Sequence, residues 1–437
     1  MRDRPFLFCS RLRSGPCAQH VFGANIRAKP TRPNVHRVHY GELVRETQLA
    51  DKSPFETEGL AVEWPVLLEC VSPNCDPQRL SDLLRKEPDW SVLLPLAEKH
   101  GVLGLLAKRL QSCDATSVTE GVRRKLCEKQ RALLLFTLST TAELFRLLES
   151  FAAAGLDALV VKGPALSARA YGDPGVRQYQ DVDLVVRQRD ISRITELMTS
   201  EGYEPKVPLN AIAAGKIPGE YLFRWPGTYR RVELHTEQTL RYFPRPLPVE
   251  EFFERRTFVS FDAHAAPALS AEDELLLNCV HSAKHFWERL LWVADVAALV
   301  SREKNFDWDR AFSTAREAGA ERMLSLGLLL AAKVLQVKLP RDVEKLIRSD
   351  RGAARLAAEI ARRLPLAGHP QRTLLKRALF RMRMRGGLLP GAAYLLRLTL
   401  SPTEEDWATN SREKRPRVFD ALQRPVRLAR KYWRGGE

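Results

Sequence analysis

Two acidic residues with a spacing suited to metal binding lie near the end of the stretch LVVKGPALSARAYGDPGVRQYQDVDLVV, residues 159–186. Asp181 and Asp183 lie two residues apart in an apolar run. Because side chains alternate between the two faces of a β-strand, both carboxylates are expected on one face, opposite Val182 and Leu184. The pattern predicts a strand that packs a core with one face and offers oxygen ligands to a divalent cation with the other.

A third carboxylate stands in the alternating segment RVELH, residues 231–235. Glu233 and His235 share one face of the expected strand, and Val232 and Leu234 share the other. A two-metal site for phosphoryl transfer needs such a third acid, because two dications about 4 Å apart require bridging and terminal oxygens. We therefore expect Glu233 to join Asp181 and Asp183, with His235 as a neighbour that supports the ligands.

The elements before the two aspartates predict an anion site. Leu159-Val160-Val161 is typical of a short buried strand, and Lys162-Gly163-Pro164 of a turn that opens a helix through Tyr171. Free backbone N–H groups and the positive end of the helix dipole converge at such a position. Arg177, four residues before Asp181, either pairs with a phosphate or balances the acids.

The same D-x-D spacing recurs at Asp307-Trp308-Asp309, in a polar segment with helical character. Spacing alone is therefore weak support for a metal site. Asp181 and Asp183 differ in having a strand-type context, a preceding glycine turn and a third acid on another expected strand.

A second group of polar residues is expected on one long helix that begins at Ser270. At about 100° per residue, five side chains fall within one sector of this helix: His281, His285, Glu288, Trp292 and Asp295. Lys284 lies beside them and could bind a phosphate. A structural role is also open, in which hydrogen bonds and a buried Lys–Asp or His–Asp pair tie the helix to the sheet. Zinc is disfavoured, because Ser282 and Lys284 occupy the positions where zinc motifs of this spacing carry glutamate.

In combination these motifs resemble the uncharacterised bacterial nucleotidyltransferase family of the polymerase-β-like superfamily, over roughly residues 64 to 340. The resemblance is carried by Lys162-Gly163, Tyr171, Arg177, the D-V-D triplet, the V-E-L-H strand and the segment HSAKHFWERLLWVAD. Lys162-Gly163 stands where most members of the superfamily have a Gly-Ser pair. The resemblance implies that Asp181 and Asp183 bind Mg²⁺, that Glu233 completes the carboxylate set, and that Lys162 and Gly163 contact a triphosphate.

The expected fold class is α+β and mainly helical, with a small mixed β-sheet of nucleotidyltransferase type flanked by N-terminal and C-terminal helical domains. Helical periodicity up to about residue 156, strand patterns up to about residue 261 and helices thereafter define the boundaries. Five regions are predicted: a disordered basic extension 1–62, an N-terminal helical domain 63–155, the α/β core 156–265, a C-terminal helical domain 266–400 and a basic tail 401–437.

Charge and composition favour a cytoplasmic enzyme. The net charge of +16 is carried by the two ends, and the middle of the chain is slightly acidic. No apolar run reaches the roughly 18 residues of a membrane span, and seven cysteines without a C-x-x-C pair suit a reducing compartment. Nucleic acid is a possible partner of the basic C-terminal helices, but we favour solvated helical surfaces there.

The function implied by the resemblance is transfer of a nucleoside monophosphate from a nucleoside triphosphate to an unknown acceptor hydroxyl. Pyrophosphate would be released, with one or two Mg²⁺ ions as cofactor. Two alternatives stay open: a non-catalytic, antitoxin-like module that binds nucleotide on the same fold, and a nucleic-acid-binding protein.

Overall fold

The computed structural model describes residues 60–112, 118–213, 219–228, 230–237, 247–261, 264–366 and 374–400. The chain divides into two units, Met1–Asp51 and Lys52–Glu437, and every described residue belongs to the second. The expected basic extension, apart from residues 60–62, and the expected basic tail 401–437 lie outside the described residues.

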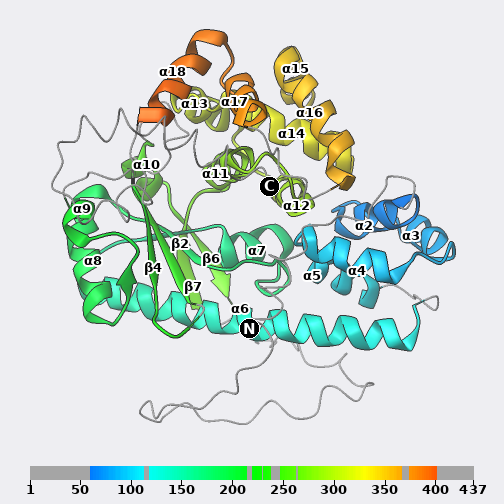
Figure 1. The fold of residues 1–437 in the computed structure, drawn as a ribbon, viewed down its shortest axis with the longest axis horizontal. Coiled ribbons are helices and arrows are strands. Elements are labelled where there is room, and N and C mark those ends of the chain that lie inside the picture. The colour runs from blue at the N-terminus through cyan, green and yellow to red at the C-terminus, as the bar shows by residue number, and fades with distance from the viewer. Residues whose placement is uncertain are drawn as a thin grey trace, which may run out of the picture. The chain divides into compact units, whose positions relative to one another are not determined.

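The fold is α+β and mainly helical, with one mixed seven-stranded sheet, as the sequence predicted (Figure 1). The strand order is β3-β4-β5-β2-β1-β7-β6. The strands are β1 Leu159–Val161, β2 Val182–Val185, β3 Glu204–Pro205, β4 Glu220–Arg224, β5 Arg231–His235, β6 Thr257–Phe261 and β7 His264–Ala268. β1 with β7 and β2 with β5 pair in parallel, and the other neighbours are antiparallel.

Local sequence explains the central strands. β4 and β5 form an antiparallel hairpin around Pro226-Gly227, where Gly227 has a φ of 71°. This left-handed backbone favours glycine, which has no Cβ to clash. β1 leads into helix α7, Gly163–Tyr171, through the turn at Lys162. The predicted order of strand, turn and helix is confirmed.

Helices precede and accompany the sheet. The N-terminal group is α2 Glu63–Val71, α3 Pro77–Leu84, α4 Trp90–Lys99, α5 Leu103–Ser112 and α6 Glu120–Ala153. Within the sheet region lie α8 Ile191–Ser200, α9 Leu209–Ala213 and α10 Val249–Glu254. The weak pattern of residues 205–218 suggests a loop, but α9 is helical because Ala211 and Ile212 are buried in the core beneath the sheet.

The C-terminal group consists of α11 Ala271–Lys284, α12 Leu290–Arg302, α13 Trp308–Glu317, α14 Glu321–Leu335, α15 Arg341–Ser349, α16 Arg351–Arg363, α17 Leu374–Arg383 and α18 Leu388–Leu400. None of the described helices combines the length and the apolar composition that crossing a bilayer requires.

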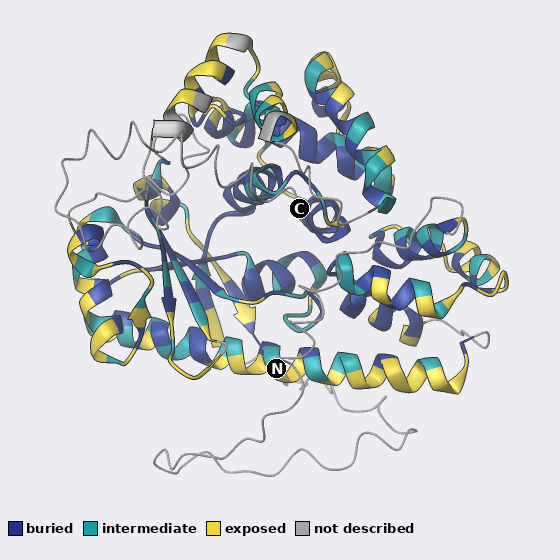
Figure 2. Ribbon diagram, viewed as in Figure 1, coloured by how far each residue is buried: buried dark blue, intermediate teal, exposed yellow. Residues whose placement is uncertain are grey.

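Two clusters of buried hydrophobic residues form the cores that hold these elements in place. Figure 2 shows where buried residues lie along the ribbon. One face of the sheet, with Val182, Leu184, Val232 and Leu234, packs on α8 and on the C-terminal half of α6. The second core joins α2 to α5 with α11 to α16. The N-terminal and C-terminal helical groups share this core. The predicted boundaries of two separate helical domains, 63–155 and 266–400, stay predictions.

The expected single helix from Ser270 through Asp295 is wrong. Ser270 does cap α11 by accepting a hydrogen bond from the Asp273 N–H, but α11 ends at Lys284. Phe286 and Trp287 follow with φ values of 59° and 54°. Each left-handed residue costs about 1–2 kcal/mol, and burial of a large apolar side chain contributes about 2–3 kcal/mol. Both side chains are buried in the helical core, and this burial stabilises a corner that no glycine or proline marks.

Candidate active site

The pairing of β2 with β5 brings two of the predicted acids together. The strands are parallel, with Asp183 opposite Glu233 and Val185 opposite His235. Directly paired residues share a face of the sheet, and so do residues two apart on one strand. Asp183, Glu233 and His235 therefore lie on the face turned away from the core of Val182 and Leu184.

These three side chains form a compact group. One ligand atom of each lies within 4.8 Å of the others. His235 Nε2 is 2.8 Å from Asp183 Oδ1 and 3.8 Å from Glu233 Oε2. His235 was expected only to support the ligands, and the geometry puts its ring nitrogen within ligand distance of the group.

Lys162 faces the same group from the turn before α7. Its Nζ is 3.1 Å from Asp183 Oδ1, and its side chain is 13% exposed. The Lys162 backbone has φ 53° and ψ −141°, and Gly163 follows with φ 44°. A Cβ on Gly163 would lie 3.8 Å from the Asp181 carbonyl oxygen, so the turn passes close to the first aspartate. Both residues of the turn therefore adjoin the acids.

Asp181 lies one residue before β2 and outside the group of three. Burial, followed by the charges of Asp183 and Glu233, raises the pKa of the Asp181 carboxyl to about 7. Burial and Asp183 also raise the pKa of Glu233. Both shifts arise because several carboxylates share a partly desolvated space.

Asp183 behaves differently from its neighbours. Burial alone would raise the pKa of its carboxyl, but the charge of Lys162 and the hydrogen bond from His235 lower it below its usual range. In Lys162, burial opposes the charges of Asp183, Glu233 and Asp181, which together raise the pKa of the ammonium group. Lys162 is therefore a cation and Asp183 an anion at neutral pH.

The donor set fits a divalent cation. Asp183 and Glu233 supply carboxylate oxygens, which suit Mg²⁺ or Mn²⁺, and His235 supplies an imidazole nitrogen, which suits transition metals. Burial first, and then the repulsion between neighbouring carboxylates, raises the pKa values of Asp181 and Glu233. A bound dication would relieve this repulsion.

A fourth acid, Glu220, completes this face of the sheet and was missed in the sequence. Glu220 pairs with His235 across the β4–β5 hairpin, and its carboxylate is 2.7 Å from Lys284 Nζ. Burial opposes the charges of Lys284 and His235, which together lower the pKa of Glu220. Counting outward from a two-residue turn at Pro226-Gly227 pairs Glu220 with Glu233, two residues from the observed register but on the same face of the sheet, so the pattern could have placed Glu220 beside the site.

The rings of His281, His285 and Trp292 cluster on the helical side of the site. The centroid of His285 is 4.7 Å from that of His281 and 5.5 Å from that of Trp292. Burial, followed by nearby lysines, lowers the pKa of both histidines, to about 3 for His285. The two imidazoles are therefore neutral at physiological pH, despite the acids nearby.

Arg177 and Asp295 lie together, at the other end of α7. Arg177 Nε is 2.9 Å from Asp295 Oδ1 and 3.0 Å from Oδ2, and the Tyr171 hydroxyl donates to Asp295 Oδ1 at 2.9 Å. Arg177 is 5% exposed and Asp295 is fully buried. Arg177 was expected to pair with a phosphate or to balance the aspartates of β2, and in the structure its carboxylate partner is instead Asp295.

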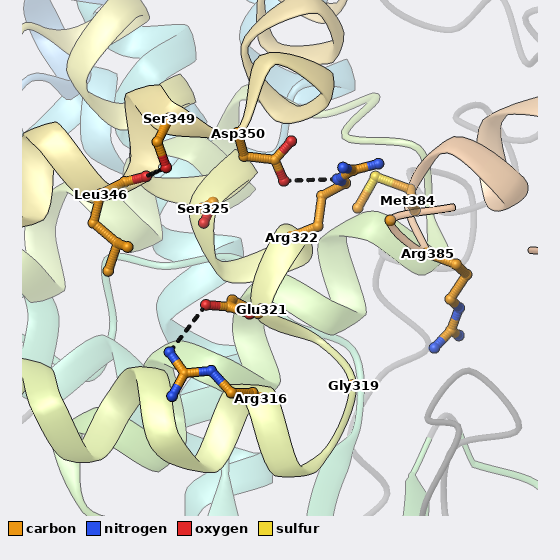
Figure 3. Close-up of a pocket in the computed structure, with 11 residues that line it drawn as sticks. Arg316, Gly319, Glu321, Arg322, Ser325, Leu346, Ser349, Asp350, Met384 and Arg385 are labelled. Atoms are coloured by element: carbon orange, nitrogen blue, oxygen red, sulfur yellow. Dashed lines mark hydrogen bonds and ion pairs between the residues drawn. The ribbon is translucent and has the colours of Figure 1, made fainter. Parts of the chain in front are cut away.

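Two described cavities lie away from the acids. One, of about 370 Å³, is bounded by α14, the α15–α16 turn and the end of α17 (Figure 3). Its Arg316 and Arg322 pair with Glu321 and Asp350, at 3.2 and 2.7 Å. The other, of about 470 Å³, is lined by parts of α2, α5, α7 and α12, including Tyr171. Neither cavity is lined by the acids or lysines of the β2–β5 face.

Comparison with known proteins identifies the family of the chain. Residues 86–336 match the model of a family described as an uncharacterised nucleotidyltransferase. The matched segment runs from α4 to α14 and includes the four acids and both lysines of the site. No curated protein matches the chain. The match covers more than half of the sequence, and the chain belongs to this uncharacterised nucleotidyltransferase family.

Proposed function

We propose that this protein is a Mg²⁺-dependent nucleotidyltransferase that moves a nucleoside monophosphate from a nucleoside triphosphate to an acceptor hydroxyl. The observation that carries the proposal is the alignment of Asp183 with Glu233 on adjacent parallel strands, facing Lys162 at the start of α7. Family membership supports nucleotidyl transfer in general.

Asp183 and Glu233 are the proposed metal ligands, with Asp181 as the third carboxylate and His235 as a further donor or a support for Asp183. The metal would supply Lewis-acid stabilisation of the charge that develops on the phosphate oxygens. Asp181 and Glu233 have raised pKa values in the free protein, and a bound dication would favour the ionised form of both carboxyl groups.

Lys162 and Lys284 are the proposed contacts for the triphosphate. Each holds a carboxylate in the free protein, Lys162 that of Asp183 and Lys284 that of Glu220. We propose that both ammonium groups turn to phosphate oxygens when the nucleotide binds. The positive end of the α7 dipole, next to Gly163, adds a partial positive charge.

The proposed reaction forms a bond between the acceptor oxygen and the α-phosphorus and breaks the bond between that phosphorus and the α–β bridging oxygen. Pyrophosphate and the proton of the acceptor hydroxyl are released. The chain contributes by positioning the two reactants and by stabilising charge, which are the main sources of catalysis in phosphoryl transfer.

Incubation with nucleoside triphosphates labelled at the α-phosphate, with a panel of acceptors, tests this function. We expect Mg²⁺-dependent pyrophosphate release that chelation abolishes and that Glu233→Gln reduces by more than about a hundredfold. Glu204→Gln is the control, because Glu204 is an exposed acid on β3 of the same sheet. Nucleotide binding without any pyrophosphate release would contradict the assignment and favour a non-catalytic module.

A further inference from the structure

The backbone of Lys162 adopts a conformation that a lysine rarely tolerates. Its φ of 53° and ψ of −141° lie near a region that is occupied almost only by glycine. A residue with a side chain is strained in this conformation. Such strain persists only where the surrounding structure fixes the backbone. Something other than the turn itself must therefore hold Lys162.

Glu274, in the first part of α11, contacts this strained residue. Its Oε1 accepts a hydrogen bond of 2.9 Å from the Lys162 backbone N–H. Glu274 is 1% exposed, and its Oε2 has no hydrogen-bond partner among the described residues. Burial raises the pKa of this carboxyl. Burying a carboxyl that is only half satisfied is costly, so packing alone does not account for an acid here.

We infer that Glu274 is a positioning residue that holds the Lys162-Gly163 turn in its strained form, so that the Lys162 ammonium group faces the carboxylates of the site. An effect of Glu274 on nucleotide binding is expected only if the proposed function is correct. The contact between Glu274 and the turn is independent of that function, because it follows from the hydrogen bond, the burial of Glu274 and the backbone angles of Lys162.

The choice of lysine at this position supports the inference. Glycine would adopt φ 53° without strain, but it has no side chain to reach Asp183, 3.1 Å from Lys162 Nζ. The molecule keeps a charged side chain at a position suited to glycine, and a buried acceptor from another element holds the backbone there. Helix α11 thus controls where the β1–α7 turn places its cation.

Amide hydrogen exchange of the free protein tests the structural part, and no nucleotide is needed. Glu274→Met keeps the side-chain volume but removes the acceptor, and we expect exchange at the Lys162 amide to accelerate about tenfold or more. Glu274→Gln keeps a carbonyl acceptor and should preserve protection. Unchanged exchange in Glu274→Met, or equal loss in Glu274→Gln, would overturn the inference.

Glu272 provides a matched control on the same turn of α11. It is also buried, at 5% exposed, but it accepts a hydrogen bond from the Asp307 N–H at 3.0 Å. Glu272→Met should accelerate exchange at Asp307 and leave Lys162 protected. If it exposed Lys162 as much as Glu274→Met does, the effect would be general loosening and the inference would fail.

Equilibrium binding of a Mg²⁺-nucleoside triphosphate tests the functional part. We expect Glu274→Met to raise the dissociation constant for nucleotide about tenfold, while the affinity of the acids for Mn²⁺ alone changes by less than about twofold. Glu274→Gln should restore nucleotide affinity. If the wild-type protein binds no nucleotide, the proposed function fails, and the exchange measurement still decides whether Glu274 holds the turn. Loss of Mn²⁺ affinity together with nucleotide affinity would overturn a role confined to the turn.

Discussion

The two ends of α7 both carry buried charges, but the charges are balanced at only one end. At the C-terminal end, Arg177 and Asp295 neutralise each other and Tyr171 adds a hydrogen bond. At the N-terminal end, four acids outnumber the nearby lysines, and two of these acids, Asp181 and Glu233, have raised pKa values. A buried ion pair whose charges neutralise each other is typical of a structural role. A buried site with excess negative charge can instead bind a positively charged ligand such as a metal ion.

Asp183→Asn should have the largest effect and should act on catalysis. It removes a proposed metal ligand from the unbalanced end, so we expect turnover to fall by more than about a thousandfold, several kcal/mol of transition-state stabilisation. Stability should also fall, because Asp183 is the counter-ion of the buried Lys162 ammonium group and its lowered pKa means that its charge is favourable in the folded protein. Steady-state pyrophosphate release and chemical unfolding measure the two quantities.

Asp309→Asn is the control for that substitution, because Asp307-Trp308-Asp309 repeats the D-x-D spacing. Asp307 caps α13 by accepting from the Arg310 N–H, and Asp309 is exposed. We expect activity within about twofold of wild type, since surface substitutions rarely have large effects. A comparable loss of activity in both variants would remove the distinction between the two triplets.

Asp295→Ala should act on stability at the balanced end. It leaves the Arg177 guanidinium buried without its counter-ion, which costs about 3–5 kcal/mol. The free energy of unfolding from urea titration measures this loss. The double variant Arg177→Met/Asp295→Leu should recover most of it, because no charge then stays buried. If Asp295→Ala instead spared stability and abolished nucleotide binding, the balanced end would belong to the active site.

Added Mg²⁺ should stabilise the wild-type protein by binding to the acids at the N-terminal end of α7. A cation that binds only the folded state adds about 2.7 kcal/mol at a concentration about a hundred times its dissociation constant. We expect a rise in the unfolding temperature for wild type and for Arg177→Met/Asp295→Leu, but little or none for Asp183→Asn. An equal rise in all three proteins would place the cation elsewhere.

His285→Gln tests whether burial and the nearby lysines keep the His285 imidazole neutral in the folded protein. The pKa of His285 is lowered from 6.5 to about 3, by burial and by Lys284 and Lys162. Below about pH 6.5 the unfolded chain binds a proton that the folded chain does not, so this histidine makes stability fall as the pH drops towards about 3. Between about pH 7.5 and pH 5.5, wild type should therefore lose about 1.4 kcal/mol more than His285→Gln. If both proteins lost the same stability over this pH range, His285 would take up its proton as readily in the folded chain as in the unfolded chain, which would contradict the lowered pKa.

The sequence predicted the fold class and the local parts of the site. The period-two patterns around Asp183 and Glu233 identified both strands, and the glycine turn identified the start of α7. These features depend on neighbouring residues, which a sequence displays directly. The roles assigned to individual site residues stay predictions until they are tested.

Long-range pairing was beyond the reach of sequence patterns. Arg177 and Asp295 are 118 residues apart, and nothing local to either residue indicates its partner. The corner at Phe286-Trp287 was missed because bulky residues rarely adopt left-handed backbone and only tertiary burial stabilises them there. The strain at Lys162 was hidden for the same reason, since its support comes from Glu274 on a distant helix.

Helix α11 touches the site at two points, Glu274 near its start and Lys284 at its last residue. At about 1.5 Å per residue, roughly 15 Å of helix axis separates them. Inserting or deleting one residue between these positions would rotate one contact by about 100° relative to the other. Only one of the two contacts could then be kept. The length of this segment is therefore under a constraint that single substitutions between its ends would not reveal, whereas a series of insertions and deletions would.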